Sequence, residues 1–541
     1  MGNFLYWIPG MLILTVCALV LSRKLIHYFQ LESYQFHGYF KTILRQYKRV
    51  ILPFVLFGIV FWFPGYSFRP DMFTDFSELA SFPFVMIVTA IVCVPVMIFT
   101  VIYHYVTGKT QEKKALVITA RVKRLIAVYA ILLFLLQSII LIIPGHLALG
   151  FYSGFIALLP LIFALAAVLA LPIERLIFRM YFNDAKKRLL QDPDLIRIGI
   201  TGSYGKTSTK FVLAEILSQK YNVLYTPSSF NTPMGVTRIV RERLESSHQV
   251  FIGEMGARHV GEIRELSNLV HPHIGILTSV GPQHLDTFRT IERIRDTKYE
   301  LIEALPEDGF AVFSDDGDIV KGLYDKTAKP KALVGTEGSD AWASDVRVSA
   351  SGSRFVLHLK GMEPIDCETE MLGEHNIRNI VVAAAVAQHL GLNRAQIIRG
   401  IASVKPVEHR LQLIHNPGGI AVIDDAFNTN PRSSKEAMKV LGSFSGRRIL
   451  VTPGMVELGA DEEKYNYEFG QAICGNADLV YLVGKKHTQP IRKGMIDGGF
   501  DENAITVCTS LNDAISRLKN VLKAGDVVMY ENDLPDNYAE N

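Results

Sequence analysis

Acidic residues are scarce in the first third of this 541-residue chain. Through Met180 there are 15 Lys and Arg residues but only 6 Asp and Glu, against 41 and 47 in the remainder. Cysteines are also few, and their spacing fits neither a disulfide framework nor a metal site: Cys17, Cys93, Cys367, Cys474 and Cys508. The pattern excludes a disulfide-stabilised secreted fold and favours buried thiols in a reducing compartment.

The same first third is rich in long apolar runs. They raise the mean hydropathy of the whole chain to +0.22, which is too apolar for an ordinary soluble protein. About five runs are long enough to cross a bilayer, and the second is the shortest: Leu5–Leu21, Val50–Tyr66, Phe82–Val106, Leu125–Pro144 and Leu147–Ile173. We therefore expect residues 1–190 to form an α-helical membrane domain.

Charges between the apolar runs predict the orientation of the chain. Six basic residues lie between the first and second runs and six between the third and fourth, whereas the intervening loop has Arg69 with three acidic residues. Under the positive-inside rule the N-terminus lies outside and the C-terminus in the cytoplasm. We expect a multi-pass protein of a bacterial-type plasma membrane, with the lipid bilayer rather than nucleic acid as its partner. No basic segment precedes Phe4, so a cleaved signal peptide is not expected.

Aromatic and basic residues are interspersed between the first two runs, over residues 25–47. Such a segment is typical of an interfacial helix or of a surface that binds lipid headgroups. Because these residue types gather at membrane interfaces without any ligand, simple anchoring is the favoured interpretation.

A strand, a glycine-containing loop and a helix follow one another from Ile196 to Leu217. The loop predicts nucleotide binding, because its glycines let backbone N–H groups face phosphate oxygens at a helix N-terminus. Lys206 supplies a positive charge and the Thr207 hydroxyl can ligate Mg²⁺. The strict Walker pattern is not met, since Ile200 holds the place of its first glycine. The expected phosphate-binding residues are Thr201, Gly202, Ser203, Tyr204, Gly205, Lys206, Thr207 and Ser208.

Two later strands end in candidate metal ligands. Glu254 follows the apolar residues 250–253, and His284 lies beyond the strand at 274–278. Ligands of open α/β sheets bind beyond the carboxyl ends of the strands, so both residues can converge on the phosphate loop and share a metal ion. A lone carboxylate or histidine is usually structural, but the shared placement with Lys206 favours a functional interpretation.

Lys298 falls on the apolar stripe of the helix predicted over Thr290–Leu305. A solvated lysine should not face the core. Either its ammonium group reaches solvent along the apolar surface, or a neutral Lys298 is held inward and reacts with CO₂ to give a carbamate that ligates Mg²⁺. The apolar residues of the stripe are Ile291, Ile294, Leu301, Ile302 and Leu305.

Nine stretches between about residues 195 and 460 carry a resemblance to a known family. In order they are Thr201-Gly-Ser-Tyr-Gly-Lys-Thr-Ser208, Asn231-Thr-Pro-Met-Gly235, Glu254-Met-Gly-Ala257, His284-Leu-Asp286, Lys298-Tyr-Glu-Leu-Ile302, Gly373-Glu-His-Asn-Ile-Arg-Asn379, His409-Arg-Leu-Gln412, Asp424-Asp-Ala-Phe-Asn-Thr-Asn-Pro431 and Gly454-Met-Val-Glu-Leu-Gly459. They resemble the Mur ligase family, most closely its MurF branch, which adds D-Ala-D-Ala to the peptidoglycan precursor.

The resemblance implies roles for single residues. Lys206 and Thr207 would hold ATP phosphates and Mg²⁺, Glu254 and His284 would serve the metal ions, and Lys298 would carry the carbamate. Asn376 and Asn379 would lie near the nucleotide base, and Arg410 near the phosphates. Asp425 and Asn428 would lie at the ribose and phosphate side.

The resemblance also implies the chemistry and the architecture. ATP would phosphorylate an acceptor carboxylate, and an amine would attack the acyl phosphate to give an amide, ADP and phosphate. A P-loop central ATPase domain is expected over residues 191–407 and a Rossmann-like C-terminal α/β domain over 408–541, where apolar strands alternate with helical stretches. Between them, alternating residues over Asp345–Leu359 predict a hairpin, interpreted as a structural insert.

Two departures from the family bear on the substrates. A membrane region stands where Mur ligases have the domain that binds a UDP sugar, so the uridine site is expected to be absent. Near the C-terminus an acidic segment, Glu531–Asp536, stands where the dipeptide-adding enzymes have a basic segment similar to Lys-Gly-Ser-Arg. The identity of the amine, an amino acid or a dipeptide, is therefore open.

Three functions remain. The first is a membrane-anchored ATP-dependent amide ligase of cell-envelope synthesis that acts on a lipid-linked or membrane-proximal carboxylate. The second is a P-loop ATPase that powers transport through the membrane domain. The apolar runs contain few charged residues, which argues against this function. The third is a catalytically inactive ligase-like scaffold, against which the intact set of Lys206, Glu254, His284, Lys298 and Asp425 argues.

Overall fold

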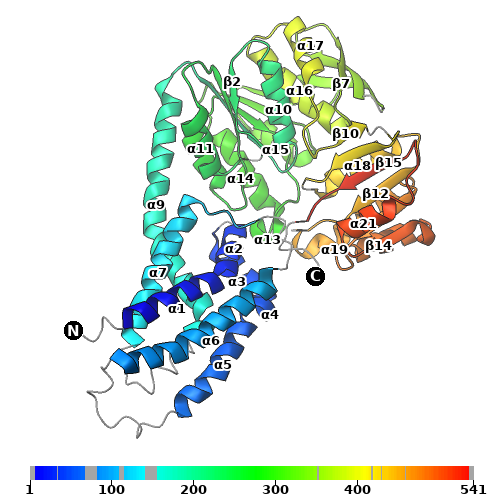
Figure 1. Ribbon diagram of the computed structural model, residues 1–541. Coiled ribbons are helices and arrows are strands. Elements are labelled where there is room, and N and C mark those ends of the chain that lie inside the picture. Colours follow the sequence, from blue (N-terminus) through cyan, green and yellow to red (C-terminus); the bar gives the residue numbers. More distant parts are fainter. Residues whose placement is uncertain are drawn as a thin grey trace. The chain divides into compact units, whose positions relative to one another are not determined.

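The computed structural model describes residues 7–32, 34–67, 82–108, 115–140, 155–228, 230–349, 352–415, 418–427, 429–456 and 458–534. The chain divides into two compact units, Met1–Phe178 and Arg179–Asn541. The first is helical, and the second contains two sheets with helices packed on their faces (Figure 1). The domain limits expected at residues 190 and 407 remain predictions.

Helices form over the apolar runs of the first unit. They are α1 (Ile8–Leu21), α2 (Arg23–Leu31), α3 (Phe36–Arg45), α4 (Tyr47–Val50), α5 (Leu52–Ser67), α6 (Phe82–Gly108), α7 (Ala120–Ile140) and α9 (Leu159–Gln191). Among the described residues, α7 and α9 are long and apolar enough to cross a membrane, and α1 with α2, bent by 41° at their junction, would make a third such segment. Residues 141–154, which include the end of the fourth predicted span and the start of the fifth, lie outside the described residues.

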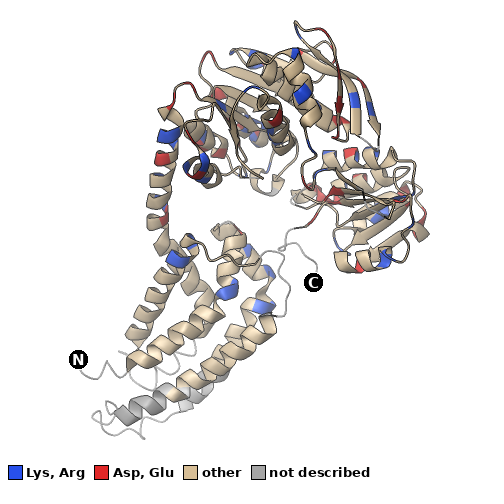
Figure 2. Ribbon diagram, turned by 45° about the horizontal axis from the view of Figure 1, so that its top comes forward, with Lys and Arg blue, Asp and Glu red and all other residues tan. Residues whose placement is uncertain are grey.

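Basic residues of this unit gather at one end of its helices (Figure 2). The Arg121 guanidinium, near the start of α7, lies 3.8 Å from the centre of the Tyr34 ring. Arg124 donates two hydrogen bonds of 2.6 and 2.9 Å to the Glu174 carboxylate of α9. The basic segments at 23–49 and 121–124, far apart in sequence, therefore lie together. The membrane topology expected from them remains a prediction.

The first sheet of the second unit has nine strands. The first six strands along the sheet are each parallel to their neighbours. The last three strands form an antiparallel extension. The predicted hairpin is confirmed, but it joins the sheet rather than standing apart as an insert. The order is β2-β3-β1-β4-β5-β6-β7-β8-β9. The strands are β1 (Ile196–Thr201), β2 (Val223–Tyr225), β3 (Val250–Glu254), β4 (Ile274–Leu277), β5 (Phe310–Ser314), β6 (Lys331–Val334), β7 (Ala341–Ser349), β8 (Gly352–Leu359) and β9 (Ile365–Thr369).

Helices cover both faces of this sheet, as near-continuous apolar strands require. Ile198 and Ile200 of β1 pack on one side, in a core shared with α10 (Lys206–Leu217), α16 (Glu374–His389) and α17 (Arg394–Ser403). Phe251 and Phe313 point to the opposite side. The second core includes side chains of α11 (Pro233–Arg243), α12 (Glu262–Val270), α14 (Ile291–Glu303) and α15 (Asp318–Lys326).

Gly199, in the middle of β1, lets α14 approach the sheet closely. A Cβ atom at Gly199 would lie 2.7 Å from Leu301 Cδ1 and 2.8 Å from Met255 Cε, closer than real Cβ contacts allow. Leu301 and Met255 are both fully buried, so a side chain there would have to displace packed core atoms. The missing side chain therefore sets the distance between the sheet and the helix that carries Lys298.

The second sheet has six strands in the order β10-β11-β15-β12-β13-β14. All neighbours are parallel except the edge strand β10, which runs antiparallel to β11. This confirms the predicted doubly wound C-terminal domain. The strands are β10 (Gln412–His415), β11 (Ala421–Asp425), β12 (Arg448–Thr452), β13 (Leu479–Val483), β14 (Ile505–Cys508) and β15 (Val527–Glu531), and the helices are α18 (Pro431–Gly442), α19 (Glu462–Ile473), α20 (Gln489–Asp497) and α21 (Leu511–Leu518).

Candidate active site

A tight loop joins the carboxyl end of β1 to the N-terminus of α10. Gly202 and Gly205 take φ angles of +149° and +80°, which residues with side chains rarely adopt. A Cβ atom at Gly202 would lie 2.1 Å from Thr278 Oγ1. The loop thus depends on both glycines, and α10 directs its unpaired N-terminal N–H groups and positive dipole end toward it, as anion binding requires.

The segment after β4 closes this loop from the side. The backbone N–H of Tyr204 donates to Ser279 Oγ at 2.6 Å, and the Ser203 hydroxyl donates to the Gly281 carbonyl oxygen at 2.9 Å. The Tyr204 hydroxyl donates to the Pro282 carbonyl oxygen at 2.8 Å. These bonds hold the phosphate loop in one conformation, which lowers the entropy cost of binding a ligand there.

Lys206 places its charge on the loop itself. Its ammonium group donates to the carbonyl oxygens of Gly202, at 2.6 Å, and Ser203, at 3.1 Å. Burial lowers the pKa of Lys206 to about 8, with Glu254 acting in the opposite direction and Arg410 in the same direction. The side chain is positioned to place a positive charge where phosphate oxygens would bind.

Glu254, at the end of β3, is fixed by three side chains. Its carboxylate accepts hydrogen bonds from the Thr207 hydroxyl at 3.1 Å, from Asn231 Nδ2 at 3.0 Å and from Lys210 Nζ at 2.9 Å. Burial would raise the pKa of Glu254, but the ammonium groups of Lys210 and Lys206 hold it below its ordinary value. The predicted neighbourhood of Glu254 and Thr207 is therefore present, with an anionic carboxylate beside the hydroxyl expected to ligate Mg²⁺.

Lys298 lies inside the protein, as its place on the apolar stripe predicts. Its side chain is 2% exposed, and no described residue forms a hydrogen bond or ion pair with it. Burial lowers its pKa well below the ordinary value, and the charge of Lys206 lowers it further. Both effects shift the equilibrium of this amine toward its neutral form.

The other metal candidate, His284, has a left-handed conformation with φ +53° just before the short helix α13 (Leu285–Phe288). Its side chain is half-buried. Among the described residues, no group of three or more His, Cys, Asp or Glu side chains could by itself hold a metal ion. Any metal site here would be completed by other oxygens, such as Thr207 and substrate phosphates, and the role of His284 remains a prediction.

One asparagine of α16, Asn379, lies beside Gly205 of the phosphate loop, and Asn376 lies next to it. Thr209 of α10 donates to Asn379 Oδ1 at 3.1 Å, and Asn379 Nδ2 donates to Asn376 Oδ1 at 3.4 Å. Asn376 is itself tied to the Leu372 carbonyl oxygen at 2.8 Å. Asn379 thus lies beside the loop with Asn376 next to it, and the nucleotide contacts expected of both remain a prediction.

Arg410 and Asp425 extend the site into the C-terminal sheet. Arg410 donates to the Thr207 hydroxyl at 3.4 Å and lies over the Phe427 ring at 4.6 Å. Burial raises the pKa of Asp425 to about 7, partly opposed by the Leu411 N–H that hydrogen-bonds its carboxylate and by Arg410. The predicted Asn428 lies outside the described residues.

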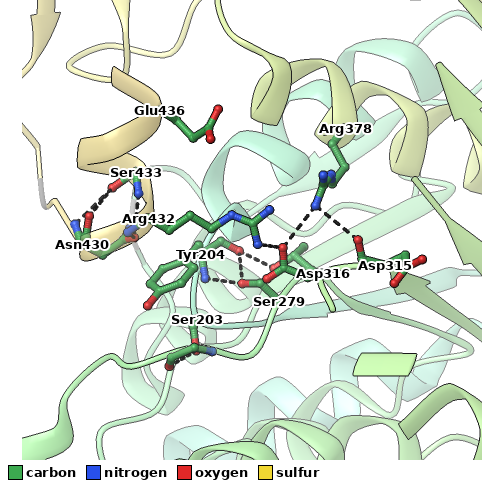
Figure 3. A network of polar contacts seen from close by, with 12 residues as sticks. Ser203, Tyr204, Ser279, Asp315, Asp316, Arg378, Asn430, Arg432, Ser433 and Glu436 are labelled. Carbon is green, nitrogen blue, oxygen red and sulfur yellow. Dashed lines mark hydrogen bonds and ion pairs between the residues drawn. The ribbon is translucent and has the colours of Figure 1, made fainter. Parts of the chain in front are cut away.

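An acidic residue that the sequence did not indicate links the two sheets. Asp316 follows β5 and forms ion pairs with Arg378 of α16 and with Arg432 of α18. Figure 3 shows both guanidinium groups directed at Asp316, close to Tyr204 and Ser279 of the phosphate-loop region. Charge-assisted bonds of this kind hold α18 beside the phosphate loop.

Comparison with known proteins identifies the family. The family model of the Mur ligase middle domain matches residues 200–387, and that of the "Mur ligase, glutamate ligase domain" matches residues 409–530. A UDP-N-acetylmuramoyl-tripeptide--D-alanyl-D-alanine ligase of Bacillus subtilis is 30% identical over 348 residues, which cover 64% of this chain and 74% of the relative. The chain belongs to the Mur ligase family. It is an ATP-dependent acid–amino-acid ligase of peptidoglycan synthesis.

Further relatives and solved structures agree. The Escherichia coli enzyme of the same name is 30% identical over 352 residues, covering 64% of this chain and 77% of that protein. MurF from Acinetobacter baumannii superimposes with a TM-score of 0.61 at 25% identity, covering 67% of this chain and 78% of the other. MurF of Thermotoga maritima, solved with ADP, shares the fold at a TM-score of 0.59, with 24% identity and coverage of 66% and 80%.

The residues present fit ATP and Mg²⁺, which Mur ligases use. The two glycines with positive φ, the Lys206 ammonium and the N-terminus of α10 form a cradle for phosphates. The Thr207 hydroxyl and the anionic Glu254 offer hard oxygen ligands beside it. Mg²⁺ would neutralise charge on the phosphates, while Lys206 and Arg410 supply fixed positive charge from the protein.

Proposed function

We propose that this Mur ligase is anchored in a membrane and forms an amide bond on a lipid-linked or membrane-proximal carboxylate, with an amino acid or dipeptide as the amine donor. The observation that carries the proposal is the N-terminal helical unit, in which α7 and α9 are apolar and long enough to span a bilayer. The family models begin only at residue 200, so this unit lies outside the part of the chain that they match. An acceptor held by a lipid would need no nucleotide-sugar site.

The charge distribution supports a plasma-membrane location with the N-terminus outside and the ligase domains in the cytoplasm. Basic residues of the segments 23–49 and 121–124 share one end of the helical unit (Figure 2). That end would face the cytoplasm under the positive-inside rule. The phosphate loop would then have access to cytoplasmic ATP.

In the proposed reaction an oxygen of the acceptor carboxylate attacks the γ-phosphorus of ATP, and ADP leaves. The amine then attacks the carbonyl carbon of the acyl phosphate, phosphate leaves, and one proton is lost from nitrogen. Lys206 stabilises charge on the transferred phosphoryl group. Arg410 donates a hydrogen bond to the Thr207 hydroxyl beside it. By analogy with the relatives named above, a dipeptide is one candidate amine.

Lys298 would take part as a carbamate. A buried neutral amine can add its nitrogen to the carbon of CO₂, and loss of one proton leaves an anionic carbamate. The added oxygens would place negative charge where Lys206 and bound Mg²⁺ can compensate it. A carbamate would also account for a lysine that has no hydrogen-bond partner among the described residues.

The function is tested by measuring ADP release from the full-length protein in detergent, with envelope lipid extract as acceptor and a panel of amino acids and dipeptides as amines. We expect at least one amine to stimulate ADP release only when the extract is present, and Lys206→Ala to abolish the stimulation. Stimulation by soluble UDP-linked acceptor but not by lipid extract would overturn the lipid-linked proposal.

The topology is tested separately. A tag fused at Asn541 should resist protease added to intact cells and be cleaved after permeabilisation. A tag cleaved in intact cells would contradict the cytoplasmic placement, since ATP would not be available to the ligase domains.

A further inference from the structure

The short helices α3 and α4 lie beside α2 at one end of the helical unit (Figure 1). One face of α3 is packed on the rest of the unit, where Tyr39 and Ile43 are 0% and 3% exposed. The Tyr39 ring meets the Phe29 ring edge-on, with 5.4 Å between their centres, and its hydroxyl donates to the Pro160 carbonyl oxygen at 3.3 Å. These contacts fix α3 on the unit in a single orientation.

A second face of the same helices is apolar and open. Phe40 and Leu44 of α3 and Tyr47 of α4 are 39%, 65% and 47% exposed. They are four and three residues apart, the spacing at which successive turns present side chains on one side of a helix. Exposed apolar area of this kind is stabilised when it is withdrawn from water. The three residues therefore form an apolar strip beside the packed face.

Exposed basic residues border this strip. Lys41 follows Phe40 on α3, and Lys48 and Arg49 follow Tyr47 on α4. None of the three lies on the strip itself, because successive residues of a helix are turned by about 100° from one another. The outside of α3 and α4 thus has an apolar strip and a basic side, which together we call the α3–α4 surface.

Acidic residues of the unit are engaged elsewhere. In the part of the helical unit that the structure describes, the acidic residues are Glu32 and Glu174. Glu32 is folded against α3, where its carboxylate accepts a hydrogen bond of 2.6 Å from Thr42 and would overlap a Cβ atom at Gly38. Glu174 accepts both hydrogen bonds of Arg124. The α3–α4 surface therefore keeps a net positive charge.

Residue types on the exposed surfaces indicate which layer of a bilayer each helix would meet. Between residues 94 and 102 of α6 every exposed side chain is apolar, as acyl chains require: Val94, Met97, Ile98, Val101 and Ile102. The α3–α4 surface instead combines aromatic and basic residues, which gather at the level of lipid headgroups. Its strip would enter the boundary of the acyl chains, and its basic side would meet the phosphate groups.

We propose that the α3–α4 surface binds the headgroups of anionic phospholipids, so that the protein discriminates anionic from zwitterionic lipid. The proposal rests on the membrane anchoring proposed above and goes beyond it, because an apolar anchor alone has no preference for headgroup charge. Each Lys or Arg near an anionic leaflet strengthens binding about fivefold. A cluster of such residues on a fixed helix therefore gives a strong preference.

The test is thermal unfolding of the full-length protein in neutral detergent micelles, to which phosphatidylglycerol or phosphatidylcholine with the same acyl chains is added. A dye that fluoresces on reaction with thiols reports unfolding. The substitutions Cys367→Ala, Cys474→Ala and Cys508→Ala leave Cys17 and Cys93, which are buried in the helical unit, as the reporting thiols. We expect phosphatidylglycerol to raise the unfolding temperature more than phosphatidylcholine does, and salt at about 0.5 M to reduce the difference.

The variant Lys41→Gln/Lys48→Gln/Arg49→Gln should lose this preference. The phosphatidylglycerol concentration that gives half of the shift should rise about a hundredfold, which is about fivefold for each residue. The variant Lys41→Arg/Lys48→Arg/Arg49→Lys keeps the three charges and should keep the preference. Without added lipid both variants should unfold at the temperature of the parent, which shows that they are folded.

A matched control removes the same number of charges from exposed positions of the ligase part of the chain: Lys321→Gln, Arg399→Gln and Lys519→Gln. This triple variant should respond to both lipids as the parent does. A loss of preference in the control as large as in the α3–α4 variant would trace the effect to the net charge of the protein and overturn the proposal.

Equal shifts of the parent with the two lipids would also overturn the proposal, as would an undiminished preference in the triple glutamine variant of α3 and α4. An equal shift produced by soluble glycerol phosphate would assign the surface to a free phosphate compound, and one produced by a polyglutamate peptide to an acidic protein, and either result would refute the lipid assignment. Failure of the anchoring proposal is measured separately by washing membranes with alkaline carbonate. Release of the parent would refute anchoring, whereas a retained protein that responds equally to both lipids would refute only the α3–α4 surface.

Discussion

Lys210 and Glu254 form an ion pair in the interior of the protein, with 2.9 Å between Lys210 Nζ and Glu254 Oε2. The two side chains are 0% and 1% exposed. Lys210 lies one turn beyond Lys206 on α10, while Glu254 ends β3. The pair therefore connects the helix that follows the phosphate loop to the strand that carries a candidate metal ligand.

Lys210→Met should destabilise the protein strongly, because it leaves the Glu254 carboxylate buried without its cation. The expected loss of unfolding free energy is roughly 3–5 kcal/mol. This loss would be measured by chemical denaturation of the full-length protein, followed through the unfolding of residues 179–541. The double variant Lys210→Met/Glu254→Gln should recover part of the loss, and strictly additive effects of the two substitutions would contradict the pairing.

Lys206→Ala should reduce turnover by several orders of magnitude, because it removes the charge that faces the transferred phosphoryl group. Membrane insertion and the unfolding temperature without nucleotide should stay close to those of the parent. The measurement is amine-dependent ADP release. A variant with near-parental turnover would show that the loop from Gly202 to Lys206 does not hold the nucleotide.

Lys298→Ala should be folded and inactive if Lys298 carries a carbamate. Added acetate or formate should restore part of the activity, because a small carboxylate can occupy the space that the side chain leaves. Lys298→Arg should not be rescued, since a guanidinium group stays positive and forms no carbamate. The measurement is ADP release with and without the added carboxylate. Parental turnover by Lys298→Arg would mean that the lysine only fills the core.

The stability of the protein should depend on pH through Glu531, the buried residue that ends β15. Burial raises the pKa of Glu531 from an ordinary value of 4.5 to about 8 in the folded protein, and Asp425 raises it further. The folded state therefore binds this proton more tightly, so the stabilisation is present below pH 4.5 and is lost as the pH rises to about 8.

Glu531→Gln lacks this titration. Its unfolding temperature should exceed that of the parent by an amount that grows between those two pH values and then levels off. The comparison requires unfolding curves of both proteins across the range. A difference that is constant with pH would show that Glu531 does not titrate on unfolding.

Much of the ligase part could be predicted from the sequence because its signals are local. The loop between β1 and α10 has glycines, a lysine and hydroxyls at fixed spacing, and the stripe on α14 predicts a buried Lys298. Contacts between distant segments gave no such signal. Lys210 looks like any lysine on a helix until β3 brings Glu254 to it, and Asp316 meets Arg432 only when both sheets are in place.

Glu531 shows the same limit. Its acidic segment is visible in the sequence, but its burial between β11 and β12 depends on the strand order β11-β15-β12, in which the last strand of the chain inserts between two earlier ones. No periodicity within residues 527–534 reports that insertion. The segment therefore could be noticed in the sequence, whereas its position at a sheet edge required the structure.

The absent side chain at Gly199 has a consequence for the candidate active site. Because Leu301 and Met255 occupy the space above β1, a methyl group at Gly199 would push α14 outward from the sheet. Lys298 lies one turn before Leu301 on that helix, so its amine would be withdrawn from Lys206 and Glu254 by the same movement. Gly199 thus acts as a spacer that sets how far the lysine reaches, and Gly199→Ala would be an inactivating substitution at a position that no substrate touches.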